Sequence, residues 1–340
     1  MSRTIRILGL VLCAVTGTMT LSAQAASAPP KREHFQNVDL IYGWAQDRAG
    51  HKLRTFVTHP RNVEAKVPAI FFVGWLSCDS VEYPDGETDS FGAILRRLID
   101  QSNYATIRMD KPGVGESEGD CAKADFESEI TGWQAAFDSL TKYDFIDSDR
   151  IFVVGLSNGG GFSPLAVRNH AVRGFVSCGS WGRTWYEHMI DLERRRLMEE
   201  GKPPAEVSSS VKAFVEFYTL YLMKGMTPGQ VVAQHPEWKS LWYDAPDGQY
   251  GRPAAFYQQL ETLNLGEVWQ KVEAPVLVIR GAGDNIMSRT DSEAIVRIVN
   301  QVHPGHAQYV QFDEMTHGFT VNGKFYEPVI PAVLEWMRGK

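Results

Sequence analysis

The sequence predicts an α/β fold with a doubly wound, mostly parallel sheet, an antiparallel hairpin at its N-terminal end and an inserted helical segment. Short apolar runs of strand length alternate with helical patterns over 68–178 and again over 275–338. Two stretches rich in β-branched and aromatic residues, on either side of a glycine-containing turn, precede the first of these runs. Between the two alternating regions, residues 183–262 carry helical patterns broken by prolines. Sheets of this kind place their functional site at the carboxyl ends of the strands.

The hairpin is expected over 38–44 and 52–58, because β-branched and aromatic residues flank a turn that ends in Gly50. The run 68–73 is apolar throughout, which is typical of a parallel strand buried on both faces. Apolar residues that recur at three and four positions predict an amphipathic helix over 125–142. Further strands are expected at 104–109, 151–155, 174–178, 275–279 and 308–312, and further helices at 91–99, 187–200, 211–223, 254–263, 292–302 and 328–338.

The first 25 residues have the pattern of a signal peptide. Two arginines precede an apolar stretch over 7–15, and Ala23-Gln24-Ala25 offers a cleavage site, with 26–28 as a second candidate. A membrane anchor fits less well, because the uninterrupted apolar stretch is short for a bilayer span. We expect removal of residues 1–25, a linker over 26–35, no stable membrane anchor, and a periplasmic or secreted protein.

The composition and motifs of the chain indicate which classes of ligand it is not expected to bind. Of the 340 residues, 44% are apolar and 22% are charged, as in an ordinary globular protein. The formal net charge of -7 gives no basic footprint, so no nucleic-acid partner is expected. The glycine-rich segment 110–119 lacks the Gly-Lys-Ser/Thr ending of a phosphate-binding loop, and no Cys/His cluster has metal spacing. We therefore expect neither a cofactor nor a metal.

The strand at 151–155 runs into Gly155-Leu-Ser157-Asn-Gly159, and small residues that can start a helix follow. This order is typical of a nucleophile elbow, in which flanking glycines let the strand and the helix close around an exposed serine. The backbone N–H of Asn158 would lie at the N-terminus of that helix, where negative charge is favoured. The alternative is a glycine-rich turn whose serine only caps a helix.

A serine nucleophile needs a base to take its proton and an acid to orient that base. Of nine histidines, only His317 falls on a loop just after the carboxyl end of a strand; His188, for example, lies in the insertion. Asp284 follows the strand at 275–279 among glycines that permit a tight turn. The alternative role for Asp284 is to cap the helix that begins near residue 292, although Asp291 is nearer to that helix.

Ser157, Asp284 and His317, in this order on this strand pattern, resemble the catalytic residues of the α/β-hydrolase superfamily. The segment from Asp110 to Ser117 resembles exported esterase-like and peptidase-like members. The resemblance assigns residues 36–182 and 263–340 to the hydrolase core and residues 183–262 to a helical lid.

The resemblance also implies an oxyanion hole and an activity. The backbone N–H of Trp75 would join that of Asn158, with Leu76 as the alternative donor because Val73 stands where the family usually has histidine. The expected activity is cleavage of carboxylic esters through an acyl-enzyme on Ser157. The alternatives are a serine exopeptidase or amidase acting on short peptides, and a non-catalytic binding protein on the same scaffold. A peptidase would need a lid carboxylate for the substrate amine, for which the candidates are Glu187, Asp191 and Glu193.

The insertion is rich in aromatic residues, and Trp181, Trp185 and Tyr186 are the candidate pocket residues. They would favour an apolar or aromatic acyl or alcohol group, although each could instead pack the lid onto the sheet. Arg183 could hold a substrate carboxylate or form a surface salt bridge. The substrate would be a small ester or a short peptide.

Three cysteines follow the signal segment. Cys78 comes after the strand at 68–73, and Cys121 comes after the strand at 104–109 and its loop. If these strands are neighbours, both cysteines lie above the same edge of the sheet and can form a disulfide, which suits an oxidising compartment. Cys178, in an apolar run, is expected to be a buried free thiol.

Overall fold

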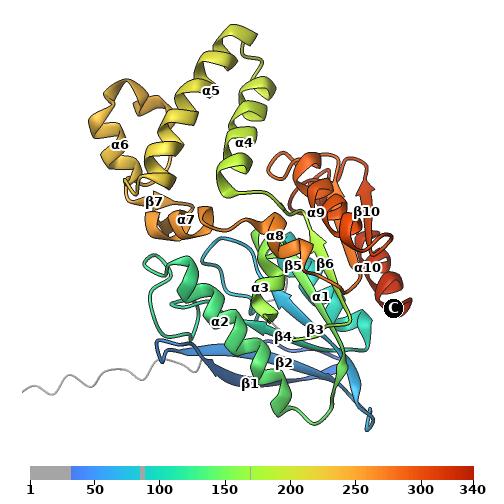
Figure 1. Cartoon of the computed structure of the whole chain (residues 1–340). Helices are drawn as coiled ribbons and strands as arrows, with labels where there is room; N and C mark the ends of the chain where they lie inside the picture. Colours follow the sequence, from blue (N-terminus) through green and yellow to red (C-terminus); the bar gives the residue numbers. More distant parts are fainter. Residues whose placement is uncertain (1–31, 85–88, 169) are drawn as a thin grey trace, which may run out of the picture. The chain divides into compact units, whose positions relative to one another are not determined.

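A computed structural model describes residues 32–84, 89–168 and 170–340. One eight-stranded sheet organises these residues, with the strand order β1-β2-β4-β3-β5-β6-β9-β10 (Figure 1). The predicted signal peptide and residues 26–31 of the predicted linker lie outside the described residues. The sheet strands are β1 Val38–Gln46, β2 Lys52–Pro60, β3 Val67–Val73, β4 Ala105–Met109, β5 Ile146–Leu156, β6 Gly174–Cys178, β9 Val276–Gly281 and β10 Ala307–Phe312.

The predicted fold class is confirmed. β1 and β2 form the expected antiparallel hairpin, which continues onto β4, and the pairs from β4 to β10 are all parallel. The helices are α1 Ser90–Ser102, α2 Phe126–Asp138, α3 Asn158–Val167, α4 Trp185–Glu199, α5 Pro204–Tyr218, α6 Pro228–Gln234, α7 Ala254–Glu261, α8 Leu265–Gln270, α9 Arg289–Val302 and α10 Val329–Arg338. Short helical turns occur at Ser139–Lys142, Thr219–Met223 and Pro236–Leu241.

Helices cover both faces of the sheet, as a doubly wound fold requires. One apolar cluster joins α1 and α10 to one face, and a second joins α2, α3, α8 and α9 to the other. The buried strands β3 and β5 are apolar because they contribute side chains to both clusters: Phe71 to one and Phe72 to the other. This two-sided burial fixes the strand ends from which the site is built.

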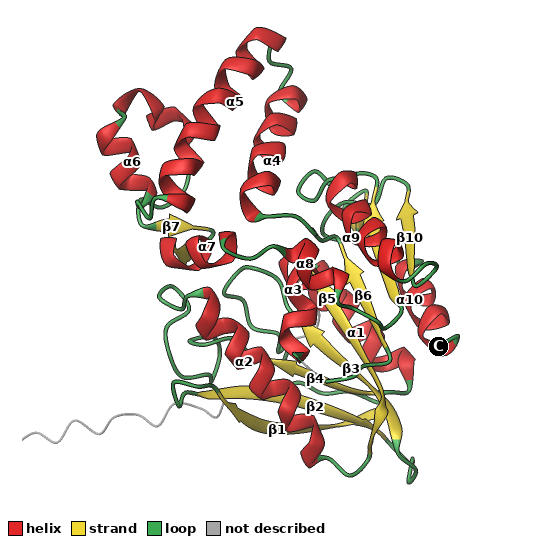
Figure 2. Cartoon of the chain, viewed as in Figure 1, coloured by secondary structure: helices red, strands yellow, loops and turns green. Residues whose placement is uncertain are grey.

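Helices α4 to α7 fall between β6 and β9, where the sequence predicts the insertion (Figure 2). The sequence predicts an insertion made of helices alone. The insertion also holds a short antiparallel hairpin with two residues in each strand, β7 Gly248–Gln249 and β8 Arg252–Pro253. Its turn has Tyr250 at φ 49° and Gly251 at φ 73°, left-handed conformations that helical periodicity cannot reveal. A second small hairpin, β11 Thr320–Val321 and β12 Lys324–Phe325, follows β10.

Two local features differ in detail from the sequence expectations. The last four residues of the predicted linker, 32–35, pack onto the sheet, because Glu33 is buried between Arg96 at 2.6 Å and Arg108 at 2.8 Å. The helix expected to begin near Ser292 begins at Arg289. Its cap is Ser288, and Asp291 closes a capping box from inside the first turn rather than capping the helix itself.

The predicted disulfide is confirmed. Cys78 and Cys121 are bonded, with their Cα atoms 6.0 Å apart, because β3 and β4 are parallel neighbours. Cys178 is a buried free thiol as expected, and burial raises its pKa to about 12. In the part of the chain that the structure describes, no helix has both the length and the apolar character that a membrane crossing requires.

Candidate active site

Ser157 lies on the turn between β5 and α3 with φ 56° and ψ -125°, a strained conformation for a residue with a side chain. Gly155 and Gly159 make that turn possible. A Cβ on Gly155 would lie 2.5 Å from the Cα of Gly160, and one on Gly159 would lie 2.2 Å from the carbonyl oxygen of Gly74. The strand and the helix therefore approach closely enough to expose the serine only because these positions are glycine.

Ser157, His317 and Asp284 form one continuous hydrogen-bonded chain. The Oγ of Ser157 is 2.9 Å from Nε2 of His317, and Nδ1 of His317 is 2.9 Å from Oδ2 of Asp284. The other oxygen of Asp284 accepts the backbone N–H groups of Ile286 at 2.9 Å and Met287 at 2.8 Å. The carboxylate is thus buried, and both of its oxygens accept hydrogen bonds. Its position holds the imidazole with Nε2 toward the serine.

The topology of the sheet explains why three residues distant in sequence meet. β5, β6, β9 and β10 are successive parallel neighbours, so their carboxyl ends lie at one edge. Ser157 follows β5, Asp284 follows β9, and His317 follows β10. Gly179, after the intervening β6, leaves room for the pair, since a Cβ there would lie 3.3 Å from Asp284 and 3.4 Å from His317.

The loop after β3 carries the two residues expected to supply an oxyanion donor, Trp75 and Leu76. Among the described residues, neither backbone N–H has a hydrogen-bond partner, so both residues remain candidates for the oxyanion donor. In contrast, the carbonyl oxygens of Trp75, Leu76 and Ser77 all accept hydrogen bonds from buried side chains. Lys111 donates to the carbonyl oxygens of Trp75, at 2.6 Å, and Ser77, and Nε of Arg252 donates to that of Leu76 at 3.1 Å.

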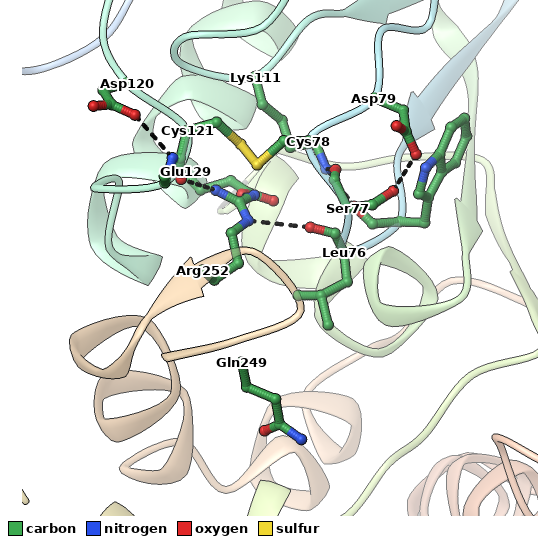
Figure 3. The surroundings of a disulfide bond; sticks show 12 residues. Leu76, Ser77, Cys78, Asp79, Lys111, Asp120, Cys121, Glu129, Gln249 and Arg252 are labelled. Atoms are coloured by element: carbon green, nitrogen blue, oxygen red, sulfur yellow. Dashed lines mark hydrogen bonds and ion pairs between the residues drawn. A yellow bond between two sulfur atoms is a disulfide. The ribbon is translucent and has the colours of Figure 1, made fainter. Parts of the chain in front are cut away.

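Figure 3 shows how Arg252 reaches this loop from β8, in the insertion. Its guanidinium also donates to the carbonyl oxygen of Cys121, at 3.1 Å, and pairs with the buried carboxylate of Glu129. Burial lowers the pKa of Arg252 to about 10 and lowers that of Lys111 well below its ordinary value. Two buried basic side chains and the disulfide thus fix the loop after β3, and Arg252 ties the insertion directly to this loop.

A pocket of about 250 Å³ opens at Ser157 and His317. Its apolar lining comes from both the core and the insertion: Trp75, Leu76, Phe91, Leu192, Ile286 and Met287. No carboxylate occurs among the described residues that line it. The pocket therefore suits an uncharged, apolar group next to the reacting carbonyl.

Of the three predicted pocket residues, the structure brings only Trp185 to this pocket. Trp181 is fully buried behind the elbow, where its indole N–H donates to the side chain of Asn158 at 2.7 Å. Tyr186 packs within the insertion, and its hydroxyl donates to the carbonyl oxygen of Val215 at 3.2 Å. Arg183 pairs with Asp291 at 2.6 Å.

Sequence reasoning missed two polar residues of the insertion that line the pocket, His188 and Tyr250. No local signal marks them, because the insertion carries them there. The described ranges 32–84, 89–168 and 170–340 contain no group of three or more His, Cys, Asp or Glu side chains that could hold a metal ion.

The three carboxylates considered for a substrate amine are all engaged elsewhere. Glu187 completes the capping box at the start of α4. Asp191 lies 3.0 Å from Nε of Arg195, and Glu193 is buried 2.9 Å from Nε of Arg196. None of the three lines the pocket at Ser157.

Comparison with known proteins supports the fold. Est1E from Butyrivibrio proteoclasticus, solved with ferulic acid bound, is similar at 18% identity with a TM-score of 0.58, over 87% of this chain and 98% of that chain. The Pyrococcus furiosus esterase Pf2001 is similar at 13% identity with a TM-score of 0.55, over 92% and 96%. Proline iminopeptidase from Mycobacterium smegmatis is similar at 19% identity with a TM-score of 0.54, over 88% and 98%.

No curated protein matches the sequence significantly. The similar solved structures are too distant in sequence to indicate more than a shared fold. A family model described as serine aminopeptidase, S33, matches residues 88–322. This match covers more than half of the chain, which therefore belongs to the serine aminopeptidase S33 family of the α/β-hydrolase superfamily.

Proposed function

We propose that this hydrolase is a serine esterase that cleaves carboxylic esters through an acyl-enzyme on Ser157. The observation that carries the proposal is the chain from Ser157 Oγ to His317 to Asp284, with both links at 2.9 Å, at the base of a mostly apolar pocket. A non-catalytic binding protein would not require a strained serine aligned with a buried imidazole–carboxylate pair.

In the proposed mechanism, Nε2 of His317 accepts the proton of Ser157 as Oγ attacks the ester carbonyl carbon. The ionised Asp284 stabilises the imidazolium that forms. The oxyanion receives hydrogen bonds from the backbone N–H groups of Asn158 and of Trp75 or Leu76, each contributing about 3 to 4 kcal/mol. His317 then protonates the leaving alcohol, and water, activated by the same imidazole, releases the acid.

The family description and the iminopeptidase neighbour suggest the second candidate, cleavage of a peptide next to a free amine. A free ammonium group needs a carboxylate partner in a site from which water is excluded. Glu187, Asp191 and Glu193 are each bonded within the insertion, and none of them lines the pocket. This arrangement favours the ester over the aminopeptidase substrate.

The substrate preference can be tested with two matched series. Hydrolysis of p-nitrophenyl acetate, butanoate and octanoate is compared with that of aminoacyl and dipeptidyl p-nitroanilides, which release the same chromophore. We expect turnover of the esters, and activity on the anilides alone would contradict the ester assignment. Ser157→Ala is the matched inactive control in both series.

We also propose that the chain is exported and that residues 183–262 act as a lid. The Cys78–Cys121 disulfide supports a periplasmic or secreted location, because such bonds persist in oxidising compartments. Insertion residues Trp185, Leu192 and Tyr250 line the pocket, so movement of the insertion would change access to Ser157. Cell fractionation followed by N-terminal sequencing tests the first idea, and a mature chain that retains residues 1–25 would contradict it.

A further inference from the structure

A second imidazole lies in the wall of the Ser157 pocket. His188, on α4, lines the pocket together with Ser157 and His317, and only 1% of its surface is exposed. The proposed mechanism uses His317 and leaves His188 without a role. A buried histidine in a mostly apolar pocket is unexplained unless both of its ring nitrogens have partners.

One nitrogen has its partner. Nδ1 of His188 is 3.2 Å from Oδ2 of Asp291, whose carboxylate also accepts the backbone N–H and the hydroxyl of Ser288 and the guanidinium of Arg183. Burial alone would raise the pKa of Asp291, but His188 and Arg183 outweigh it and hold that pKa below its usual range. The carboxylate is therefore ionised and can only accept, so Nδ1 of His188 carries the proton.

The other nitrogen is free. In residues 32–84, 89–168 and 170–340, nothing donates to or accepts from Nε2 of His188. Because Asp291 holds a proton on Nδ1, the neutral tautomer of this ring has its lone pair on Nε2, where it can accept a hydrogen bond. Arg183 supplies a permanent positive charge 2.6 Å from Asp291, so the carboxylate has a cationic partner besides the imidazole.

A free donor accompanies this acceptor. Trp185 also lines the pocket, and its buried indole N–H has no hydrogen-bond partner within the described part of the chain. Leaving such a group unpaired destabilises the folded protein. Trp185 and His188 are three positions apart on α4, and their rings are 5.0 Å apart between centroids. One unpaired donor and one unpaired acceptor thus come from the same face of one helix.

We propose that His188 and Trp185 form a polar subsite that binds a hydroxyl group on the substrate, which makes hydroxylated carboxylic esters the preferred class. The substrate hydroxyl donates to Nε2 of His188 and accepts from the indole N–H of Trp185. A hydroxyl suits this pair because it offers one donor and two acceptor lone pairs. The inference rests on the proposed esterase function, since it places a substrate group beside Ser157.

The test uses methyl 3-phenylpropanoate and its 3-hydroxyphenyl and 4-hydroxyphenyl analogues at pH 8. Two methylene groups separate the ring from the carbonyl, so the hydroxyl does not change the intrinsic reactivity of the ester. We expect the wild type to prefer at least one hydroxylated ester about five- to tenfold in kcat/KM, the effect of one or two hydrogen bonds. His188→Leu should bring that ratio to about 1.

Two further variants separate binding from folding. His188→Gln keeps an acceptor near the position of Nε2 and should retain most of the preference. Leu192→Val changes an apolar residue of the same helix that lines the same pocket, and it should leave the ratio unchanged. Equal kcat/KM for hydroxylated and unsubstituted esters in the wild type, or a preference that survives in His188→Leu, would overturn the subsite.

A binding measurement distinguishes failure of this inference from failure of the esterase proposal. Isothermal titration of Ser157→Ala with the same esters reports the subsite without turnover. We expect tighter binding of the hydroxylated ester, and loss of that difference in Ser157→Ala/His188→Leu. Hydrolysis without any hydroxyl preference would overturn the subsite alone. Preferential binding without hydrolysis in the wild type would support the subsite and contradict the esterase proposal.

Discussion

Nζ of Lys111 lies 2.6 Å from the carbonyl oxygen of Trp75, beneath the loop that carries the candidate oxyanion donors. The same atom donates to the carbonyl oxygen of Ser77, so one buried side chain fixes the Trp75–Leu76 and Ser77–Cys78 peptide planes. A trans peptide points its N–H opposite to its carbonyl group. Holding the carbonyl of Trp75 therefore directs the N–H of Leu76 away from Lys111.

Replacing Lys111 should impair catalysis more than substrate binding. Lys111→Met removes the donor to both carbonyl groups and frees the loop, and we expect kcat on p-nitrophenyl acetate to fall about 10- to 100-fold with little change in KM. That loss is smaller than complete removal of an oxyanion donor. The matched control is Lys123→Met, at an exposed lysine paired with Asp120. A Lys111→Met enzyme with the kcat of the wild type would show that the loop orients itself.

Replacing Asp284 should misorient His317. Asp284→Asn keeps the size of the side chain but removes the charge that fixes the imidazole, and the expected fall in kcat is about 10⁴-fold. Steady-state kinetics on p-nitrophenyl butanoate measure it. Asp313→Asn, an exposed position on the loop before His317, is the control and should retain activity. A small effect of Asp284→Asn would mean that another group orients the base.

The disulfide should contribute substantially to stability. It closes a loop with a sequence separation of 43, for which chain entropy predicts about 4 kcal/mol of unfolding free energy. Cys78→Ser/Cys121→Ser should lose about that amount in urea denaturation. Cys178→Ala, which leaves the disulfide intact, should lose less. Equal losses in the two proteins would contradict a stabilising role for the bond.

Asp110 should make the protein less stable as the pH rises through the weakly acid range. Burial raises its pKa to about 6, although the backbone N–H of Val81 and the hydroxyl of Ser80 lower it in part. The folded state therefore binds a proton that the unfolded chain releases near pH 4, so this stabilisation is complete below pH 4 and is lost as the pH passes 6.

Asp110→Asn removes this titration while preserving the shape of the side chain. The difference in unfolding free energy between variant and wild type should change by about 3 kcal/mol from pH 4 to 7, at about 1.4 kcal/mol for each unit of pKa shift. Urea denaturation at several pH values measures the change. The surface variant Asp144→Asn is the control. Parallel curves for Asp110→Asn and the wild type would contradict the raised pKa.

Periodicity and turn chemistry predicted most of the fold because they are local properties. The apolar run of β3 and the glycines around Ser157 require nothing beyond their own neighbours to be interpreted. The chain from Ser157 through His317 to Asp284 could also be anticipated, because each residue follows a strand and parallel strands end at one edge.

The insertion could not be predicted in the same way. Nothing in the sequence around His188 indicates that it meets Asp291, because that contact depends on how α4 packs against α9. Arg252 likewise reaches Leu76 only through the unpredicted hairpin of β7 and β8. Trp181 shows the opposite error, since an aromatic residue assigned to the pocket proves to position Asn158 from behind. Long-range packing decides each of these cases.

The proposed chemistry requires that Ser157 is a nucleophile activated by His317. The most direct measurement is the intact mass of the protein after reaction with a fluorophosphonate, with peptide mapping of the modified residue. We expect one adduct on Ser157, absent from Ser157→Ala and His317→Ala, together with a loss of about 10⁶-fold in kcat for Ser157→Ala. An unmodified wild-type protein, or an adduct on Ser157 that forms at the same rate in His317→Ala, would contradict it.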